Sequence, residues 1–470
     1  MAGSVNTTPG FNLQPSAERV PVATNYITNF DFLNQYLPDT YEKEFERYGN
    51  RTVAGFMRMV GAEMPTNSDL IKWAEQGRLH TKYTSVAANG VITDDVASFT
   101  VNDLLVPAGT VTTGGSGGIA IRVGQTVFIT ANNGTGSNKA VVTLVDYGTS
   151  TFTVAFYEGA GQAMAVGVDC TVMIYGSEFK KGTTGMVESL EADDFIFENK
   201  PIILKDKYAV SGSDMAQIGW IEVTTENGAN GYLWYMKSEH ETRLRFDDYL
   251  ETSMLEAVPM DNAANANAAK GTDGIFYTIE NRGNVWSGGI PAALADFDAI
   301  ISRLDKQGSI EENVIFVDRD FSFAIDDMLA AQNSYGAGGT SYGLFDNDEQ
   351  MALNLGFTGF RRGYDFYKSD WKYLNDPTMR GGLSSGGING MMVPAGSTTV
   401  YDQVLGKNAK RPFLHVRYRA SETEDRRYKT WITGSAGGAA TSDRDAMEVN
   451  YLSERAVCTM GANNFFLFTD

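Results

Sequence analysis

Asp318 and Asp320 form the carboxylate pair in this sequence that comes closest to a catalytic arrangement. They follow the apolar segment VIFV (314–317). Two carboxylates at the end of a strand can serve phosphoryl transfer, one attacking phosphorus and the other acting as acid or base beside Mg²⁺. The later lysine and acidic motif that this chemistry needs is not evident, and an aspartate at 318 also caps the helix expected from residue 320. Helix capping is the favoured interpretation, and a phosphotransferase stays an alternative hypothesis.

Three further patterns match only part of a catalytic or metal-binding motif. Residues 382–386 (GLSSG) fit GxSxG, but that motif needs a strand before it and a helix after it, and we expect neither. The pair His240-Glu241 lacks the second histidine of HExxH. The acidic run 346–349 lacks the glycine that a calcium loop has at its sixth position, where Met351 stands. The sequence therefore predicts no catalytic residue, no metal ion and no cofactor.

The charge of the chain limits its partners. It has 58 acidic and 38 basic side chains, so its net charge is −20. An acidic surface repels phosphate backbones and anionic lipid. General nucleic-acid binding and membrane association are therefore not expected.

The cysteines and the first residues indicate the compartment. Cys170 and Cys458 are the only cysteines, so the chain alone can build neither a disulfide scaffold nor a cysteine zinc site. The first 30 residues lack the basic start and apolar run of a secretory signal, which predicts a cytoplasmic destination. The charge-free stretches 104–121 and 381–401 are rich in Gly, Ser and Thr and contain proline, so we expect no membrane span.

The N-terminal quarter changes character twice. Residues 1–29 carry one acid, one base and three prolines, which predicts an extended arm. Residues 30–77 are amphipathic and aromatic and predict short helices, one of them capped by Thr66 or Ser68 and ended by Gly77.

A β-rich unit follows. Residues 84–176 hold 8 charged side chains in 93, against 88 in the other 377. Short β-branched runs alternate there with turn sequences such as NNGTGSN, which predicts an all-β barrel or sandwich inserted over 84–185. Residues 78–83 and 186–222 also look like strands. We therefore expect a two-stranded excursion that carries the insert at its tip.

The second half alternates helix and strand. Apolar side chains at helical spacing predict a long helix over 232–258 within a unit that spans 223–274. A helix over 292–304, a strand over 314–317 and a helix over 320–333 predict an α/β layer within 275–405. Residues 406–470 are expected to be loops and strands that end in a buried strand.

Residues 407–429 are basic within an acidic chain, with eight bases and three acids. Such a strip could contact an acidic patch of a neighbouring copy. A solvated strand face without a partner and a local DNA contact stay open as alternatives.

The order of these elements resembles the Hong Kong 97-type major capsid protein of tailed bacteriophages. The resemblance is carried by the arm 1–29, the excursion, the helix 232–258, the layer 275–400 and the segment EVNYLSERAVCTMGANNFFLF, so it spans nearly the whole chain. It implies an α+β fold with an N-terminal arm, an E-loop, a peripheral domain built on a spine helix, and an axial domain, here with an inserted all-β domain. The segment GMMVPAG (390–396) is similar in style to capsid proteins of crAss-like phages.

The resemblance also implies a function. Copies of the chain would form hexamers and pentamers of an icosahedral head around double-stranded DNA, after assembly in the host cytoplasm. Portal, scaffold, and auxiliary capsid or head-fibre proteins would be partners, and DNA would be a loose neighbour. From position and residue type, the expected inter-subunit contacts are Phe32, Tyr36, Tyr41, Phe45, Trp73, Arg78, Lys82, Arg417 and Arg419. The alternative is a head-decoration or tail protein whose β domain binds glycan or a host surface.

Overall fold

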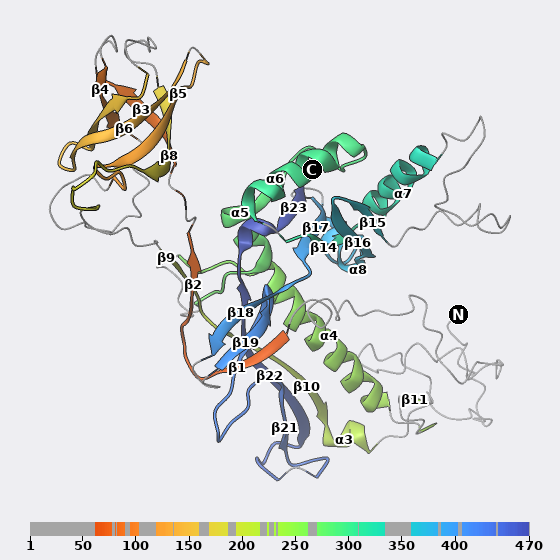
Figure 1. The fold of residues 1–470 in the computed structure, drawn as a ribbon. Helices are drawn as coiled ribbons and strands as arrows, with labels where there is room; N and C mark the ends of the chain where they lie inside the picture. The colour runs from red at the N-terminus through yellow and green to blue at the C-terminus, as the bar shows by residue number, and fades with distance from the viewer. Residues whose placement is uncertain are drawn as a thin grey trace, which may run out of the picture.

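The described residues of this computed structural model form a body with two β-sheets, and a small β-barrel stands apart from that body on a two-stranded stalk (Figure 1). The predicted arm 1–29 and the segment 30–61 lie outside the described residues. The structure describes residues 62–77, 80, 82–89, 95–102, 119–134, 136–158, 169–186, 194–216, 223–224, 230–231, 234–261, 270–308, 310–333, 359–383, 387–402, 407–438 and 440–469.

β22 (Ala446–Thr459) is the central strand of a five-stranded sheet. One of its edges pairs antiparallel with β10 (Ile202–Ser211). The other edge pairs first with β21 (Lys429–Gly434) and then with β20 (Leu414–Arg419), and β20 continues to the parallel strand β1 (Ala62–Thr66). At about 3.3 Å per residue β22 extends roughly 46 Å, long enough to serve two partners in succession on one edge.

Helix α4 (Trp234–Glu256) packs against β10 and β22. It is the long helix that the sequence predicts over 232–258. Phe246 of α4 is fully buried and stacks on Tyr451 of β22 with the ring centroids 5.6 Å apart. The Tyr451 hydroxyl donates to Glu239 on the same helix at 2.7 Å. The helix is therefore held to the sheet by a buried aromatic pair with a satisfied polar edge.

The second sheet has six strands, and helices cover both of its faces. Along β14, Ile315 and Val317 pack with α6 and α7 on one face, whereas Phe316 packs with α5 and α8 on the other. Strands buried on both faces are continuously apolar, as VIFV is. In order the strands are β13 (Asn284–Trp286), β23 (Phe466–Thr469), β17 (Ile388–Pro394), β14 (Glu312–Val317), β16 (Tyr364–Asp370) and β15 (Gly359–Arg362). The helices are α5 (Ile275–Arg282), α6 (Leu294–Gln307), α7 (Arg319–Asn333) and α8 (Lys372–Asn375).

The C-terminal segment joins the two sheets. The sequence analysis keeps 406–470 in one unit, but the structure places β22 in the five-stranded sheet and the last strand, β23, in the six-stranded sheet. A turn at Gly461, with φ of 62°, and the short helix η5 (Ala462–Asn464) separate these strands. One buried cluster contains Val457 from the first sheet and Leu467 from the second. The two sheets therefore share a core.

The inserted unit is a closed barrel, the first of the two predicted alternatives. Its interior is filled by its own side chains, with Phe99 stacked on Phe152 at 5.5 Å between ring centroids. Around the barrel the strands are β3 (Lys82–Ala88), β4 (Val96–Val101), β7 (Thr151–Phe156), β6 (Ser137–Asp146), β5 (Gln125–Ala131) and β8 (Asp169–Ser177).

The stalk consists of β2 (Ile71–Gln76) paired antiparallel with β9 (Asp194–Asn199). The prediction of a helix that ends at Gly77 is therefore wrong. It was based on two local signals, a capping residue and a terminal glycine. Six residues of this segment instead form a strand because they pair with β9, and this tertiary pairing outweighs the local preference for a helix. The excursion also has other boundaries than predicted, because Lys82 already begins the barrel and β10 belongs to the five-stranded sheet.

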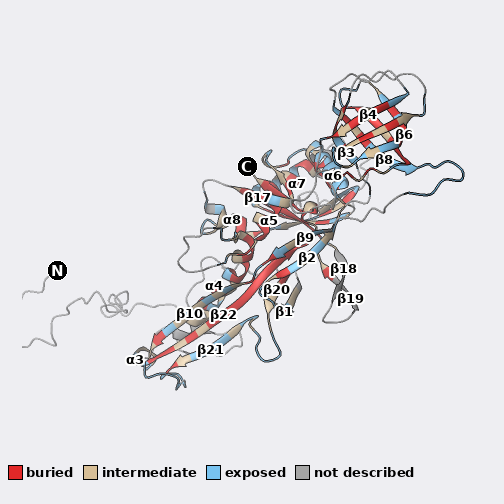
Figure 2. Ribbon diagram, turned by 90° about the vertical axis from the view of Figure 1, so that its left-hand side faces the viewer, coloured by how far each residue is buried: buried red, intermediate tan, exposed pale blue. Residues whose placement is uncertain are grey.

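Burial follows this architecture (Figure 2). Buried residues run along β22 and β17, and exposed ones lie along β10 and β21. Both cysteines are buried, and neither forms a disulfide. The remaining short elements are α3 (Gly212–Met215), β11 (Val223–Thr224), β12 (Asn230–Gly231), η4 (Arg380–Gly382), β18 (Ser397–Asp402) and β19 (Lys407–Pro412).

Candidate assembly surface

The base of the stalk is fixed to the body by one buried amide. Asn199, the last residue of β9, is 4% exposed. Its Nδ2 donates to the carbonyl oxygens of Val457 and Asp273 at 2.7 and 3.0 Å. Its Oδ1 accepts from the Thr272 hydroxyl and from the Asp273 and Lys200 amides at 2.8 to 2.9 Å. One side chain thus satisfies buried groups of three separate segments.

Arg282, at the end of α5, adds a second anchor. Its guanidinium lies 3.8 Å from the ring centroid of Phe197 and 5.8 Å from that of Trp73. Its Nη1 is 3.7 Å from Glu75 Oε1, an oxygen that also accepts from the indole of Trp73 and from the Gly461 amide. Burial lowers the pKa of Arg282, with Glu75 acting in the opposite direction. The base of the stalk is therefore attached by cation–π contacts and shared acceptors.

Further along the stalk, large apolar side chains are exposed on both faces. Strand pairing places Phe195 opposite Glu75 and Ile196 opposite Ala74, on opposite faces because side chains alternate along a strand. Phe195 is 46% exposed and Ile196 is 68% exposed. A two-stranded ribbon is marginally stable by itself. We call Phe195 and Ile196 the stalk patch. A molecule that covered the stalk would bury these two side chains.

The five-stranded sheet presents a second candidate surface on the face away from α4. Trp431 and Lys207 lie opposite Asn450 on this face, and Ile203 lies opposite Glu454. Ile203 is 53% exposed and Trp431 is 36% exposed. The same face carries ion pairs such as that of Lys207 with Glu448 at 3.5 Å. The face is charged with interspersed apolar residues, as the rim of an interface is.

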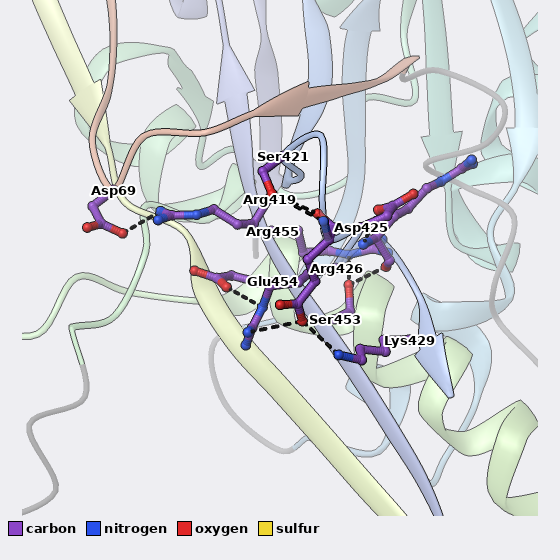
Figure 3. Close-up of polar contacts among 11 residues, drawn as sticks. Asp69, Arg419, Ser421, Asp425, Arg426, Lys429, Ser453, Glu454 and Arg455 are labelled. Atoms are coloured by element: carbon purple, nitrogen blue, oxygen red, sulfur yellow. Dashed lines mark hydrogen bonds and ion pairs between the residues drawn. The ribbon is translucent and has the colours of Figure 1, made fainter. Parts of the chain in front are cut away.

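Four bases of the basic stretch 407–429 form ion pairs within the chain. Figure 3 shows the side chains of Arg419 and Arg426 directed toward carboxylates of the same molecule. Arg419 pairs with Asp69, Arg426 Nε lies 2.7 Å from Glu454, and Arg427 pairs with Glu63. Lys429 reaches Glu424 at 2.7 Å. These pairs lie within one chain, so a solvated face without a partner molecule, a contact with another copy and a DNA contact all stay predictions, and the last two would compete with existing pairs.

The predicted contact residues fall in different places. Trp73 is half-buried at the base of the stalk, Lys82 is exposed at the start of β3, and Arg417 and Arg419 are half-buried on β20. Their roles between subunits stay predictions. Phe32, Tyr36, Tyr41, Phe45 and Arg78 lie outside the described residues.

The sequence analysis missed the stalk patch and Asn199. The segment DFIFEN carried a signal for the first, since consecutive apolar residues at 195–197 cannot all face one side of a strand.

The catalytic candidates have structural explanations where the structure describes them. Asp318 Oδ1 accepts from the Phe321 amide at 2.7 Å, which is the capping contact of α7. Arg319, which lies between the two aspartates in sequence, forms an ion pair with Asp370 at 2.6 Å. Among the described residues no group of three or more His, Cys, Asp or Glu side chains could hold a metal ion. The acidic run 346–349 and part of GLSSG lie outside the described residues.

No described helix is long and apolar enough to span a membrane.

His415 is the histidine downstream of GLSSG, and it is buried on β20 opposite Cys458. Burial lowers the pKa of His415 to about 4, and Arg417 and Arg411 act in the same direction, whereas the Pro412 carbonyl raises it. The His415 imidazole therefore resists protonation and packs in the core as a neutral side chain. The same burial raises the pKa of the Cys458 thiol to about 12.

We expect this burial to make the fold sensitive to acid. Below about pH 6.5 the unfolded chain binds a proton at His415, whereas the folded chain binds it only near pH 4, so folding stability falls as the pH drops through this window. The 2.5-unit difference corresponds to about 3 kcal/mol at pH 4. The measurement is urea unfolding at pH 7.5 and 4.5.

His415→Gln should remove this part of the pH dependence, and the exposed His80 supplies the matched control His80→Gln. An unchanged pH dependence in His415→Gln would show that other groups cause the loss.

No protein-family model and no curated protein sequence matches this chain, but solved structures do. A structure from Microbacterium phage Oxtober96 is similar with a TM-score of 0.40 and 10% identity, over 94% of this chain and 99% of that one. A structure from Mycobacterium phage Ogopogo has a TM-score of 0.39 and 9% identity, over 93% and 98%. The capsid of a native GTA particle has a TM-score of 0.39 and 9% identity, over 95% and 99%. These are phage and capsid structures, the group that the sequence resemblance predicts, while the crAss-like group stays a prediction.

Proposed function

We propose that this chain is the major capsid protein of a tailed bacteriophage, with a Hong Kong 97-type subunit. The observation that carries the proposal is the stalk: a two-stranded ribbon anchored firmly at its base and exposing Phe195 and Ile196 on opposite faces. Exposed apolar side chains on both faces of a projecting ribbon indicate burial against other molecules. A shell subunit has neighbours on every side and would provide that burial.

In this proposal each part of the structure takes the role of a part of the expected subunit. The five-stranded sheet with α4 takes the place of the peripheral domain and its spine helix, and the six-stranded sheet with α6 and α7 takes that of the axial domain. The stalk is in the position of the E-loop. The barrel is an insertion at its tip, and its independent core is consistent with that.

In this function the chain assembles into hexamers and pentamers that close an icosahedral head around double-stranded DNA. The stalk of one subunit lies across its neighbour and buries the stalk patch there. The net charge of −20 suits an inner wall that must not hold DNA tightly while it is packaged and ejected. Portal, scaffold, and auxiliary capsid or head-fibre proteins complete the virion, which assembles in the bacterial cytoplasm.

Ile196→Asp should abolish closed shells, because a neighbouring subunit would have to bury an unpaired carboxylate, at a cost of several kcal/mol. The wild-type chain, expressed alone and with its neighbouring genes, should give shells or rings of five and six subunits. Negative-stain electron microscopy and size-exclusion light scattering measure both. Leu144→Asp is the matched control, since Leu144 is 62% exposed on the barrel instead of the stalk.

Two outcomes would contradict the proposal at different levels. A wild-type chain that stays a monomer or trimer in both samples would favour a head-decoration or tail protein. Normal shells from Ile196→Asp would keep the capsid function but remove the stalk patch from the subunit interface.

A further inference from the structure

The outer wall of the barrel contains a hollow of about 740 Å³, within the range of small-molecule sites. It lies where β5, β6 and β8 run side by side, next to the residue that follows β7, Tyr157, whose amide donates to the Lys139 carbonyl at 3.1 Å. We call it the barrel hollow; the lining residues that matter here are Phe128, Lys139, Tyr157, Tyr175, Gly176 and Glu178.

An irregularity in the strand ladder shapes the hollow. On β5, Thr126 pairs with Gly176 of β8, but the next residue, Val127, pairs with Ile174, so the ladder skips Tyr175. A β-bulge of this kind redirects the side chain of the extra residue. Tyr175 is 48% exposed although it sits in the middle of a paired strand region.

Gly176 keeps the hollow open. A Cβ at this position would stand 3.1 Å from the hydroxyl of Thr126, a contact so tight that the Thr126 side chain would have to shift by a few tenths of an ångström. The backbone there does not need glycine for its own conformation, since its φ is not positive. The missing side chain therefore leaves space in the wall beside Tyr175.

The lining combines aromatic faces with hydrogen-bonding groups. Val127 and Ile129 fill the barrel core, so Phe128 between them points outward, and it lies beside Lys139 in the strand register. Tyr157, 48% exposed, donates its hydroxyl to Glu178. That hydrogen bond raises the pKa of Tyr157 to about 12, and the nearby Tyr175 contributes in the same direction. The phenol rings of Tyr157 and Tyr175 thus both line the hollow.

This combination selects the class of ligand. One lysine faces two glutamates, Glu158 and Glu178, on a chain of net charge −20, which disfavours nucleic acid, sulfated polymers and anionic lipid. A wholly apolar ligand would make no use of the hydrogen-bonding capacity of the lining, which includes the Ser137 hydroxyl and the Glu178 carboxylate. A sugar ring has an apolar C–H face that packs on an aromatic ring and hydroxyls that bond to carboxylates, amides and phenols.

We propose that the barrel hollow binds a neutral oligosaccharide, with Tyr175 as the stacking platform and Glu178 and Tyr157 as hydrogen-bonding partners. The site is independent of the proposed function, since binding requires the folded barrel and not a closed shell.

Saturation-transfer NMR on the full chain tests this with three neutral hexasaccharides, maltohexaose, cellohexaose and chitohexaose, and with hexagalacturonate as the acidic comparison. We expect transfer to at least one neutral hexasaccharide and a weaker signal from the acidic one. Tyr175→Ala should weaken the affinity about tenfold or more, whereas Tyr175→Phe, which keeps the ring, should change it by less than about threefold. Gly176→Val should also abolish binding by filling the wall.

Tyr367→Ala is the matched control, because Tyr367 is 51% exposed on β16 of the body. The proposal is overturned if no neutral hexasaccharide receives saturation from the wild-type chain. It is equally overturned if Tyr175→Ala and Gly176→Val bind as the wild type does, or if hexagalacturonate binds more tightly than all three neutral sugars. Shell formation is scored separately, so a failed saccharide test leaves the capsid proposal untouched.

Discussion

Asn199→Leu should destabilise the two-sheet body by about 4 kcal/mol. Leucine has nearly the same volume but makes none of the hydrogen bonds of the amide, so the carbonyl of Val457, the hydroxyl of Thr272 and the amide of Asp273 lose their partner. Each buried group left without a partner costs about 1 to 3 kcal/mol. The stalk should also loosen at its base, because its last residue no longer holds to the body.

Urea unfolding followed by tryptophan fluorescence measures this loss. All six tryptophans lie outside the barrel strands, and Trp73 lies on β2 of the stalk, so the signal does not come from the barrel. The adjacent variant Glu198→Gln is the control, since Glu198 forms only an exposed ion pair with Lys72 and should change stability by less than about 0.5 kcal/mol. If Asn199→Leu and Glu198→Gln lower the free energy of unfolding by the same amount, Asn199 does not anchor the stalk. Hydrogen exchange adds a local measure, because the Asp273 amide should exchange faster only in Asn199→Leu.

Phe246→Ala should cost a comparable 3 to 5 kcal/mol and weaken the attachment of α4 to its sheet. Phe246 is completely buried, stacks on Tyr451 and meets Tyr428 edge to face at 5.4 Å between centroids. Removing a buried phenylalanine ring forfeits its transfer free energy and leaves a cavity that the rigid sheet cannot close. The same fluorescence experiment measures the loss.

Tyr249→Ala on the same helix is the control for Phe246→Ala. Tyr249 is 46% exposed, so its truncation should cost less than about 1 kcal/mol. If Phe246→Ala costs no more than Tyr249→Ala, the aromatic stack is not what holds α4 in place. In a shell subunit, loss of α4 would also be expected to reduce the yield of assembled particles.

The elements that the sequence predicts well are those whose signal is local. The helix over 232–258 and the α6–β14–α7 succession show their periodicity, capping aspartate and terminal glycine within a few residues. The barrel is predicted by β-branched runs and turn sequences, and its low charge separates it from its surroundings. The periodicity and the end signals of these elements can be read within a single segment, although the residues that bury them come from distant parts of the chain.

The surroundings of the predicted contact residues depend on tertiary contacts that the sequence does not show. Trp73 was singled out as a contact residue, but within the chain it packs beside Phe197 under Arg282. Arg419 was chosen for its charge, and its partner Asp69 lies 350 positions away. The exposed Phe195 and Ile196 were not singled out, because an apolar run does not by itself show which side chains the fold will cover.

The sequence by itself determined the local elements of this protein: the long helix, the α/β layer, the inserted β unit and the acidic surface that disfavours general nucleic-acid binding. Only the tertiary structure decided that residues 71–76 are a strand of the stalk, that β23 leaves its neighbour β22 for the other sheet, and that Asn199 ties together segments more than 250 residues apart. The physical reason is that a strand has no internal hydrogen bonds, so its partner and register come from distant parts of the chain, whereas a helix satisfies its backbone within itself.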